Sequence, residues 1–207
     1  MIVDNTITEF INELKSAAPT PGGGGVAALN SANGVALIMM VANLTIHEEK
    51  YMAWHLPCRK ILFEAQNLLD ELTAGIDKDA EEFGKVIEAY KLPHSTDEEL
   101  SARSTAIGEA SIGATQAPLN IMACSIKGME LVKKMLGRSN PNVESDLFVA
   151  TLSLYSGLLS AQYSVNANLE GIGKVRPEAV NRVIATRDEL VRKGYALSMD
   201  ILSKSEK

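Results

Sequence analysis

The sequence contains little cysteine, few aromatic residues and no excess of positive charge. Two Cys in 207 residues exclude a disulfide-stapled scaffold and fit a reducing compartment, the cytoplasm. A formal net charge of −6 argues against a dedicated nucleic-acid-binding protein. Hydrophobic residues make up 46% of the chain, which excludes intrinsic disorder, and aromatics only 5%, so much of the apolar surface is small. Residues 1–20 lack the basic start and the apolar run of a signal peptide, so none is expected.

Two long stretches of the sequence carry no charged residue. They cover residues 16–46 and 147–169, and each is long enough to cross a bilayer of about 30 Å. Both contain amide and hydroxyl side chains, which are costly in hydrocarbon without partners. A membrane-spanning helix stays an alternative. We expect instead two central helices that other helices surround on all sides, and no membrane partner.

The remaining sequence is patterned for helices. A capping box at Thr6 precedes a short amphipathic helix that ends near Ala18, and longer helices are expected over 25–46, 57–90, 96–136, 143–169 and 177–204. Pro118 should kink the helix expected over 96–136 near Thr115. The prediction is an all-α fold, a single bundle of about six helices in one domain of residues 1–207. Two apolar central helices are many for this length, so one should face a second copy in a homodimer.

A run of Pro and Gly at residues 19–25 precedes the first charge-free helix. Backbone N–H groups at a helix start, together with the positive end of the helix dipole, can bind an anion or a carbonyl oxygen. The run lacks the Gly-Lys-Ser/Thr of a P-loop, and no strand precedes it as in a dinucleotide-binding fingerprint. A flexible connector is the alternative interpretation.

Two polar clusters border apolar helical segments. In the first, residues 77–82 are mostly acidic, and Asp79 lies four residues before Phe83, which we expect on the buried face. A carboxylate at that border would have a raised pKa, although a solvated acidic face is the alternative. The second cluster, residues 139–146, either caps the next helix or places Asp146 beside a buried segment, where it needs a partner.

Amides and histidines elsewhere are less informative. Asn43, Asn166 and Asn168 lie within the charge-free segments, where they could pair across helices or hydrogen bond to the edges of a heterocycle. The three His are scattered in polar turns without the spacing of metal ligands, so no metal site is expected.

Four segments resemble the cyclodeaminase domain of the formiminotransferase-cyclodeaminase family, in the same order and at similar spacing. They are the Ala-Pro-Thr-Pro-Gly-Gly-Gly-Gly run at 18–25 with residues 40–46, the acidic motif at 79–90, the Asn-x-Asn-x-x-Ser-Asp motif at 140–146, and a late Asn at 168. Within the family, residues 92–99 look most like the free-standing methenyl-tetrahydrofolate cyclohydrolase of one-carbon metabolism. One departure is His-Glu-Glu at 47–49, where relatives often have Gly-Lys-Lys; it leaves Lys50 as the candidate contact for an acidic folate tail.

The resemblance implies an all-helical, dimeric hydrolase that converts 5,10-methenyl-tetrahydrofolate to 10-formyl-tetrahydrofolate, with folate as the substrate and no cofactor or metal. The alternatives are a formimino-tetrahydrofolate cyclodeaminase that releases ammonia, and a non-catalytic helical folate-binding or scaffold protein. The implied acid/base pair is Asp79 and Asp146. The residues expected to bind the substrate are Pro21, Gly22, Gly23, Gly24, Asn43, Lys50, Asn140, Asn142, Ser145 and Asn168.

Overall fold

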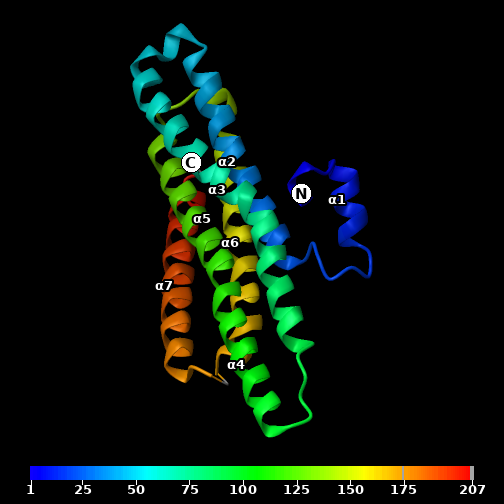
Figure 1. Ribbon diagram of the computed structural model, residues 1–207. Coiled ribbons are helices and arrows are strands. Elements are labelled where there is room, and N and C mark those ends of the chain that lie inside the picture. Colours follow the sequence, from blue (N-terminus) through cyan, green and yellow to red (C-terminus); the bar gives the residue numbers. More distant parts are fainter. Residues whose placement is uncertain (174, 206–207) are drawn as a thin grey trace.

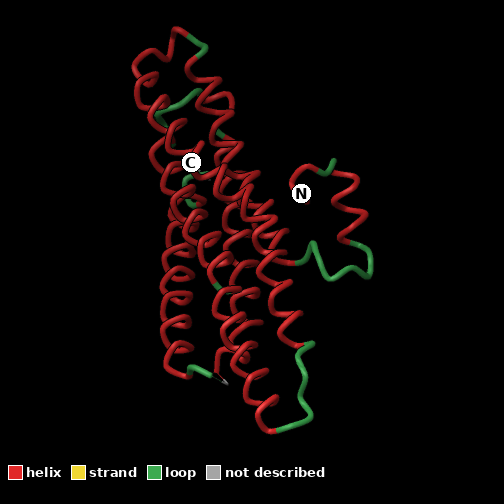
Figure 2. The backbone as a smooth tube through the Cα atoms, in the orientation of Figure 1, coloured by secondary structure: helices red, strands yellow, loops and turns green. Residues whose placement is uncertain are grey.

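The protein is an all-α bundle, as the sequence predicts (Figure 1). The computed structural model describes residues 1–173 and 175–205, and within these ranges it contains helices and no strand (Figure 2). The α-helices are α1 (Ile7–Leu14), α2 (Gly23–Ile46), α3 (Met52–Tyr90), α4 (Asp97–Ala114), α5 (Gln116–Met135), α6 (Ser145–Gly173) and α7 (Pro177–Leu202). Short 3₁₀ turns are η1 (Ile2–Asp4), η2 (Glu49–Tyr51) and η3 (Pro141–Val143).

Helices α2 to α7 run as long rods side by side, whereas α1 projects from the side of the bundle (Figure 1). The charge-free helix α2 packs most extensively against α6, the other charge-free helix, and against α3. Val35 and Ile38 of α2 and Leu154 and Leu158 of α6 are completely buried in this core. The expectation that other helices surround both of them is wrong, however, because each keeps one exposed side. The exposed residues include Asn33, Ala36, Met40 and Leu44 on α2 and Val149, Leu152 and Tyr163 on α6.

Local sequence signals explain most helix boundaries. The capping box at Thr6 is present, and Thr96 caps α4 in the same way. The helix expected over 96–136 is interrupted at Thr115 and forms two helices rather than one kinked helix. Pro118 accounts for the break, because it cannot donate to the carbonyl of Ala114 and its ring clashes there. The remaining ends differ by a few residues: α1 ends at Leu14 rather than near residue 18, and α3 begins five residues before Pro57.

Helix α2 is also the one helix, in the ranges that the structure describes, that is long and apolar enough to cross a membrane. Its most apolar 18-residue window has a mean hydropathy of 1.6, but 56% of that window is buried inside the bundle. The core helix of a bundle passes the same test of length and composition.

Gly157 allows α6 to approach α2 closely. A Cβ atom at this position would lie 2.0 Å from Ser31 Oγ and 2.8 Å from the carbonyl oxygen of Ala27. Ser31 is itself fixed, since its hydroxyl donates to the Ala27 carbonyl and lies 2.8 Å from the hydroxyl of Ser125 on α5. The contact therefore ties three helices together at a point where no side chain fits.

Replacing Gly157 with Ala is expected to lower the free energy of unfolding by about 1–3 kcal/mol, because the added methyl group overpacks a rigid contact. Chemical denaturation of the purified variant measures the change. The matched control is Gly84→Ala on α3, where a Cβ atom meets nothing within 4 Å. This control should be neutral or up to about 1 kcal/mol more stable. Equal effects of the two substitutions would contradict the packing argument.

Candidate active site

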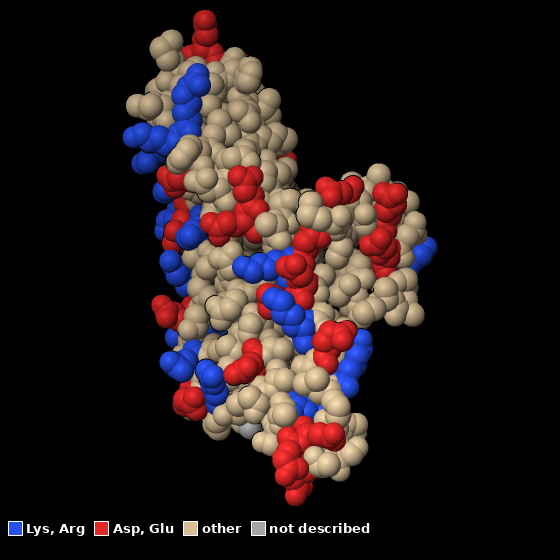
Figure 3. Space-filling model, viewed as in Figure 1, with Lys and Arg blue, Asp and Glu red and all other residues tan. Residues whose placement is uncertain are grey.

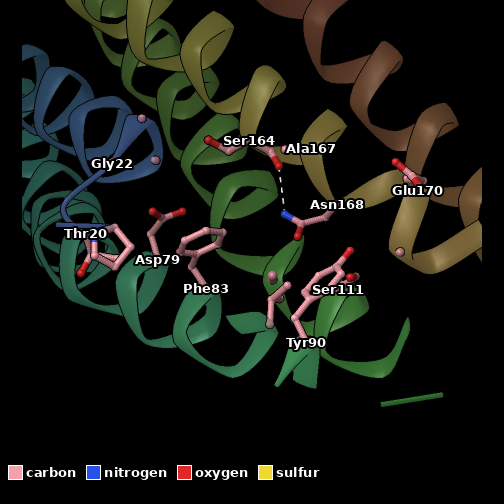
Figure 4. A pocket seen from close by; sticks show the side chains of 16 residues that line it. Thr20, Gly22, Asp79, Phe83, Tyr90, Ser111, Ser164, Ala167, Asn168 and Glu170 are labelled. Atoms are coloured by element: carbon pink, nitrogen blue, oxygen red, sulfur yellow. Dashed lines mark hydrogen bonds between the residues drawn. The ribbon is translucent and has the colours of Figure 1, made fainter. Parts of the chain in front are cut away.

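A cavity of about 390 Å³ lies between the start of α2, the second half of α3, and parts of α4 and α6 (Figure 4). This volume is within the range of small-molecule sites. Its lining combines glycine backbone, the carboxylates of Asp79 and Glu170, two aromatic rings, several hydroxyl groups and one side-chain amide. The lining residues are Pro19, Thr20, Gly22, Gly23, Gly24, Asp79, Phe83, Val86, Tyr90, Ser111, Ala114, Ser164, Ala167, Asn168, Glu170 and Gly171.

Asp79 is half-buried in this cavity. Its carboxylate points into the space between Gly22 and Ser164 (Figure 4). Burial raises the pKa of Asp79 above its ordinary value, and a hydrogen bond from the backbone N–H of Gly25 offsets part of this effect. The carboxyl is thus poised to accept a proton more readily than a solvated aspartate.

Gly24 provides the space in which Asp79 lies. A Cβ atom on Gly24 would fall 1.9 Å from Asp79 Oδ1, so no other residue fits there without displacing the carboxylate. Helix α2 begins at Gly23, and its N-cap, Gly22, has no side chain to satisfy the first-turn N–H groups. The glycine-rich run therefore brings the positive end of α2 directly beside the carboxylate.

Phe83 and Tyr90 form an aromatic wall of the cavity. Phe83 was expected in the buried face of α3, but it is 41% exposed and lines the cavity instead. Arg103 of α4 donates two hydrogen bonds to the carbonyl oxygen of Tyr90, at 2.8 and 3.1 Å, and lies over its ring. Neither aromatic residue was singled out as a site residue. The signal was present, because Asp79, Phe83 and Tyr90 share one face of α3 at i, i+4 and i+11.

The structure brings five of the expected site residues to this cavity, and their roles stay predictions. Besides Asp79 and the three glycines at positions 22–24, Asn168 of α6 lines it. The amide nitrogen of Asn168 donates to the carbonyl oxygen of Ser164 at 3.0 Å, which fixes its orientation (Figure 4). Pro21 is buried next to Gly25 and does not line the cavity.

The remaining expected site residues lie in or near the segments at the other end of α2 and the start of α6, and we call them the amide cluster. Its backbone is well fixed, because the N–H of Asn140 donates to Thr45 Oγ1 at 2.9 Å and Asn140 Oδ1 accepts from the N–H of Asn142 at 3.0 Å. Lys50 lies in the turn after α2 and pairs with Glu48 at 3.2 Å. The members of this cluster are Asn43, Lys50, Asn140, Asn142, Ser145 and Asp146.

The two clusters are too far apart to act on one atom within a single chain. Gly24 touches Asp79, and Thr45 touches Asn140. At 1.5 Å per residue, these two positions on α2 are about 30 Å apart. Within one chain the two aspartates are therefore too far apart to act on one atom, and their assignment as an acid/base pair stays a prediction. Sequence spacing could not show this separation. The acidic motif with Asp79 and the motif with Asn140 and Asp146 both lie beside α2 and α6, but at opposite ends of these helices.

In the described part of the chain, no three His, Cys, Asp or Glu side chains gather as a metal ion requires. His47 and His55 each bond a backbone carbonyl oxygen, at 2.8 and 3.1 Å.

The cavity suits a flat heterocyclic ligand with an electrophilic carbon. The aromatic wall offers apolar contact to such a ring, and hydroxyl and amide groups offer hydrogen bonds to its edges. The Asp79 carboxylate, whose pKa is raised by burial, can accept a proton from an attacking water.

Comparison with known proteins assigns the family. The formiminotransferase-cyclodeaminase family model matches residues 6–184. The chain is 42% identical over 172 residues to a methenyltetrahydrofolate cyclohydrolase of Methylorubrum extorquens. This alignment covers 83% of each of the two proteins. It is 30% identical over 169 residues to the formimidoyltransferase-cyclodeaminase of Mus musculus, but spans 31% of that longer protein. The structure of a formiminotetrahydrofolate cyclodeaminase from Thermotoga maritima shares the fold, with a TM-score of 0.73 over 98% of this chain and 100% of that one at 23% identity. The chain therefore belongs to the formiminotransferase-cyclodeaminase family.

Proposed function

We propose that this protein is a methenyltetrahydrofolate cyclohydrolase that converts 5,10-methenyl-tetrahydrofolate and water to 10-formyl-tetrahydrofolate. The observation that carries the proposal is the half-buried carboxylate of Asp79. This residue of α3 lies beside the start of α2, in the cavity that Phe83 and Tyr90 line. The similarity to the bacterial cyclohydrolase supports it, because that relative is matched over 83% of its own length, whereas the chain spans about a third of the mouse enzyme.

The chemistry of the substrate explains why one carboxylate is central. The bridge carbon of the substrate lies in a cationic amidinium, so a nearby carboxylate stabilises it electrostatically. Asp79 takes a proton from water as the water oxygen forms its bond to the bridge carbon. The bond between this carbon and N5 then breaks as the proton passes from Asp79 to N5. The hydroxyl group of the adduct releases its proton to solvent, which leaves the carbonyl of the formyl group on N10. Water is the second reactant, so the proposal includes no resident cofactor or metal.

The cavity also accounts for binding. The pterin ring packs against Phe83 and Tyr90, while the amide of Asn168 and the hydroxyl groups contact its edges. The backbone N–H groups of the glycine run bind a carbonyl or carboxylate oxygen of the ligand.

A cyclodeaminase activity is the second candidate. That reaction closes the ring of 5-formimino-tetrahydrofolate, gives the same methenyl compound and releases ammonia, so a carboxylate near one carbon and a set of amides would serve it too. The similarity to longer formimidoyltransferase-cyclodeaminases favours it, but more distantly.

The proposal extends to the setting of the enzyme. We propose a homodimer in the cytoplasm, one domain over residues 1–207, with no nucleic-acid or membrane partner. The net charge of −6 and the two free, buried cysteines, Cys58 and Cys124, are consistent with this setting.

An absorbance assay tests the proposed function. Purified protein mixed with 5,10-methenyl-tetrahydrofolate should bleach the methenyl absorbance faster than buffer alone. A parallel reaction with 5-formimino-tetrahydrofolate should give no accelerated formation of the methenyl compound and no ammonia. Activity in the second reaction only would assign the cyclodeaminase function instead. Activity in neither would favour a non-catalytic protein.

Replacing Asp79 with Asn should lower kcat by about 10²–10⁴-fold, the usual contribution of a general base. In the unmodified enzyme, kcat/KM should fall on the acid side with an apparent pKa above 3.8, the ordinary value for Asp. The control is Asp70→Asn, an exposed aspartate on the same helix, which should keep full turnover.

The same Asp79→Asn variant should be more stable than the original protein at pH 7. Burial raises the carboxyl pKa in the folded state, so the charged form opposes folding at neutral pH and the Asn variant lacks that charge. The stability difference should shrink as the pH falls through 3.8, because below this value the carboxyl is protonated in both the folded and the unfolded state. A variant that loses both activity and stability at pH 7 would instead indicate a structural role for Asp79.

Gly24→Ala should lower kcat/KM by about 100-fold, because its methyl group occupies the position of the Asp79 carboxylate and a displacement of about 1 Å has an effect of that size. Gly84→Ala on α3 is again the control, and it should remain active. Full activity of Gly24→Ala would show that the position of Asp79 is not critical.

A further inference from the structure

The guanidinium of Arg103 on α4 contacts Tyr90, the last residue of α3, in two ways. Its Nε and Nη2 atoms donate to the carbonyl oxygen of Tyr90 at 3.1 and 2.8 Å. The same group lies 5.5 Å from the centroid of the Tyr90 ring. Hydrogen bonds from a charged donor are stronger than those between neutral groups. One side chain therefore holds both the backbone and the ring of a residue that lines the cavity.

The carbonyl oxygen of Tyr90 is available to Arg103 because α3 ends at this residue. The first backbone N–H groups after the helix bond to the carbonyl oxygens of Glu88 and Ala89. Carbonyl groups at a helix C-terminus lack intrahelical donors and form the negative end of the helix dipole. A guanidinium is stabilised at this position both by its hydrogen bonds and by the dipole.

Arg103 does not take part in the ion pairing that is common on the surface. Lys and Arg lie among Asp and Glu over much of the face shown in Figure 3, and Lys134 pairs with Glu64 at 3.0 Å. Among the residues that the structure describes, Arg103 has no carboxylate partner. Glu99, one turn before it on α4, caps the start of that helix instead. The hydrogen bonds of Arg103 to Tyr90 are therefore not a by-product of an ion pair.

The ring of Tyr90 depends on this contact for a fixed position. Tyr90 is 48% exposed, and within residues 1–173 and 175–205 its hydroxyl group makes no hydrogen bond. Exposed side chains change rotamer on the picosecond to nanosecond timescale. Arg103 restricts this motion before a ligand binds, which lowers the entropic cost of ordering the ring on binding.

Tyr90 lies at the end of the α3 wall away from Asp79. These two residues are the first and the last that α3 contributes to the cavity (Figure 4). At 1.5 Å per residue they are about 16 Å apart along the helix. A ring at that distance contacts the ligand away from the reacting carbon, so a fixed ring serves binding rather than proton transfer.

We propose that Arg103 is a positioning residue that holds Tyr90 as a fixed wall of the ligand site. Arg103 is not part of the cavity lining, and it acts through Tyr90 rather than by contact with the ligand. The identity of the ligand rests on the proposed function, whereas the hold of Arg103 on Tyr90 does not.

Replacing Arg103 with Ala should raise KM for 5,10-methenyl-tetrahydrofolate by about 3- to 10-fold and leave kcat within about twofold. The fixed ring contributes equally to binding of the ground state and of the transition state. Arg103→Lys should restore little, because an ammonium group lacks the planar fork that bonds the carbonyl twice. The control is Arg192→Ala, at an exposed arginine of α7, which should match the unmodified enzyme. A merely structural role would lower the active fraction, and hence kcat, at unchanged KM; that result would overturn the proposal.

A double-substitution experiment tests whether Arg103 acts through the ring. Tyr90→Ala should raise KM by a similar factor, and in that background Arg103→Ala should raise it no further, because no ring is left to hold. Tyr90→Phe keeps the ring and should retain the original KM. Multiplicative effects of the two alanine substitutions would contradict the proposal. So would an Arg103→Ala effect that disappears with a methenyl-tetrahydropteroate substrate, since this compound lacks the anionic glutamate tail and the result would indicate direct contact with that tail.

Crystal structures without ligand separate this proposal from the proposed function. The Tyr90 ring should have one position in the unmodified protein and should be displaced or disordered in Arg103→Ala. An unchanged ring in the variant would overturn the positioning role. An unmodified protein that neither converts nor binds any folate, with the ring displaced in the variant, would instead contradict the proposed function alone.

Discussion

The close packing of α2 against α3 and α6 positions the glycine run, Asp79 and Asn168 of the candidate active site. Small residues allow the helix backbones to approach, as at Gly157, where a methyl group would overlap Ser31. At the start of α2 the same closeness places Gly24 against Asp79, and the carboxylate takes the space that a side chain would fill. The scarcity of aromatic residues and the abundance of small ones thus have a single explanation, because a bulkier α2 would separate the helices and open the cavity.

This arrangement carries an energetic cost that identifies its purpose. A half-buried carboxylate with a raised pKa destabilises the folded protein at neutral pH, and a purely structural role would favour an uncharged residue at position 79. The Gly25 N–H and the positive end of α2 offset this cost in part. A charge held in this way is useful where a cation is bound and a proton is transferred, as in the hydrolysis of a methenyl bridge.

Much of the fold could be predicted from the sequence, because helical periodicity, capping boxes and prolines act locally. The all-α class and the charge-free central helices followed from such signals, whereas the break at Thr115 and the exposed sides of α2 and α6 depend on packing between helices. For the site, the cluster of Gly22, Gly24, Asp79 and Asn168 was anticipated from motifs, but Phe83 was expected in the core. Motif order could not reveal how far apart the two motifs lie, because that depends on how the helices run. The stretch of α2 from Gly24, which touches Asp79, to Thr45, which touches Asn140, is about 30 Å long.

A crystal structure of the protein with bound 10-formyl-tetrahydrofolate tests the central claim most directly, because it locates the reacting carbon relative to Asp79. The account predicts a pterin ring against Phe83 and Tyr90, with an Asp79 oxygen within about 2.6–3.2 Å of the formyl oxygen or N5. A ligand bound away from this cavity, with Asp79 out of hydrogen-bonding reach, would contradict it.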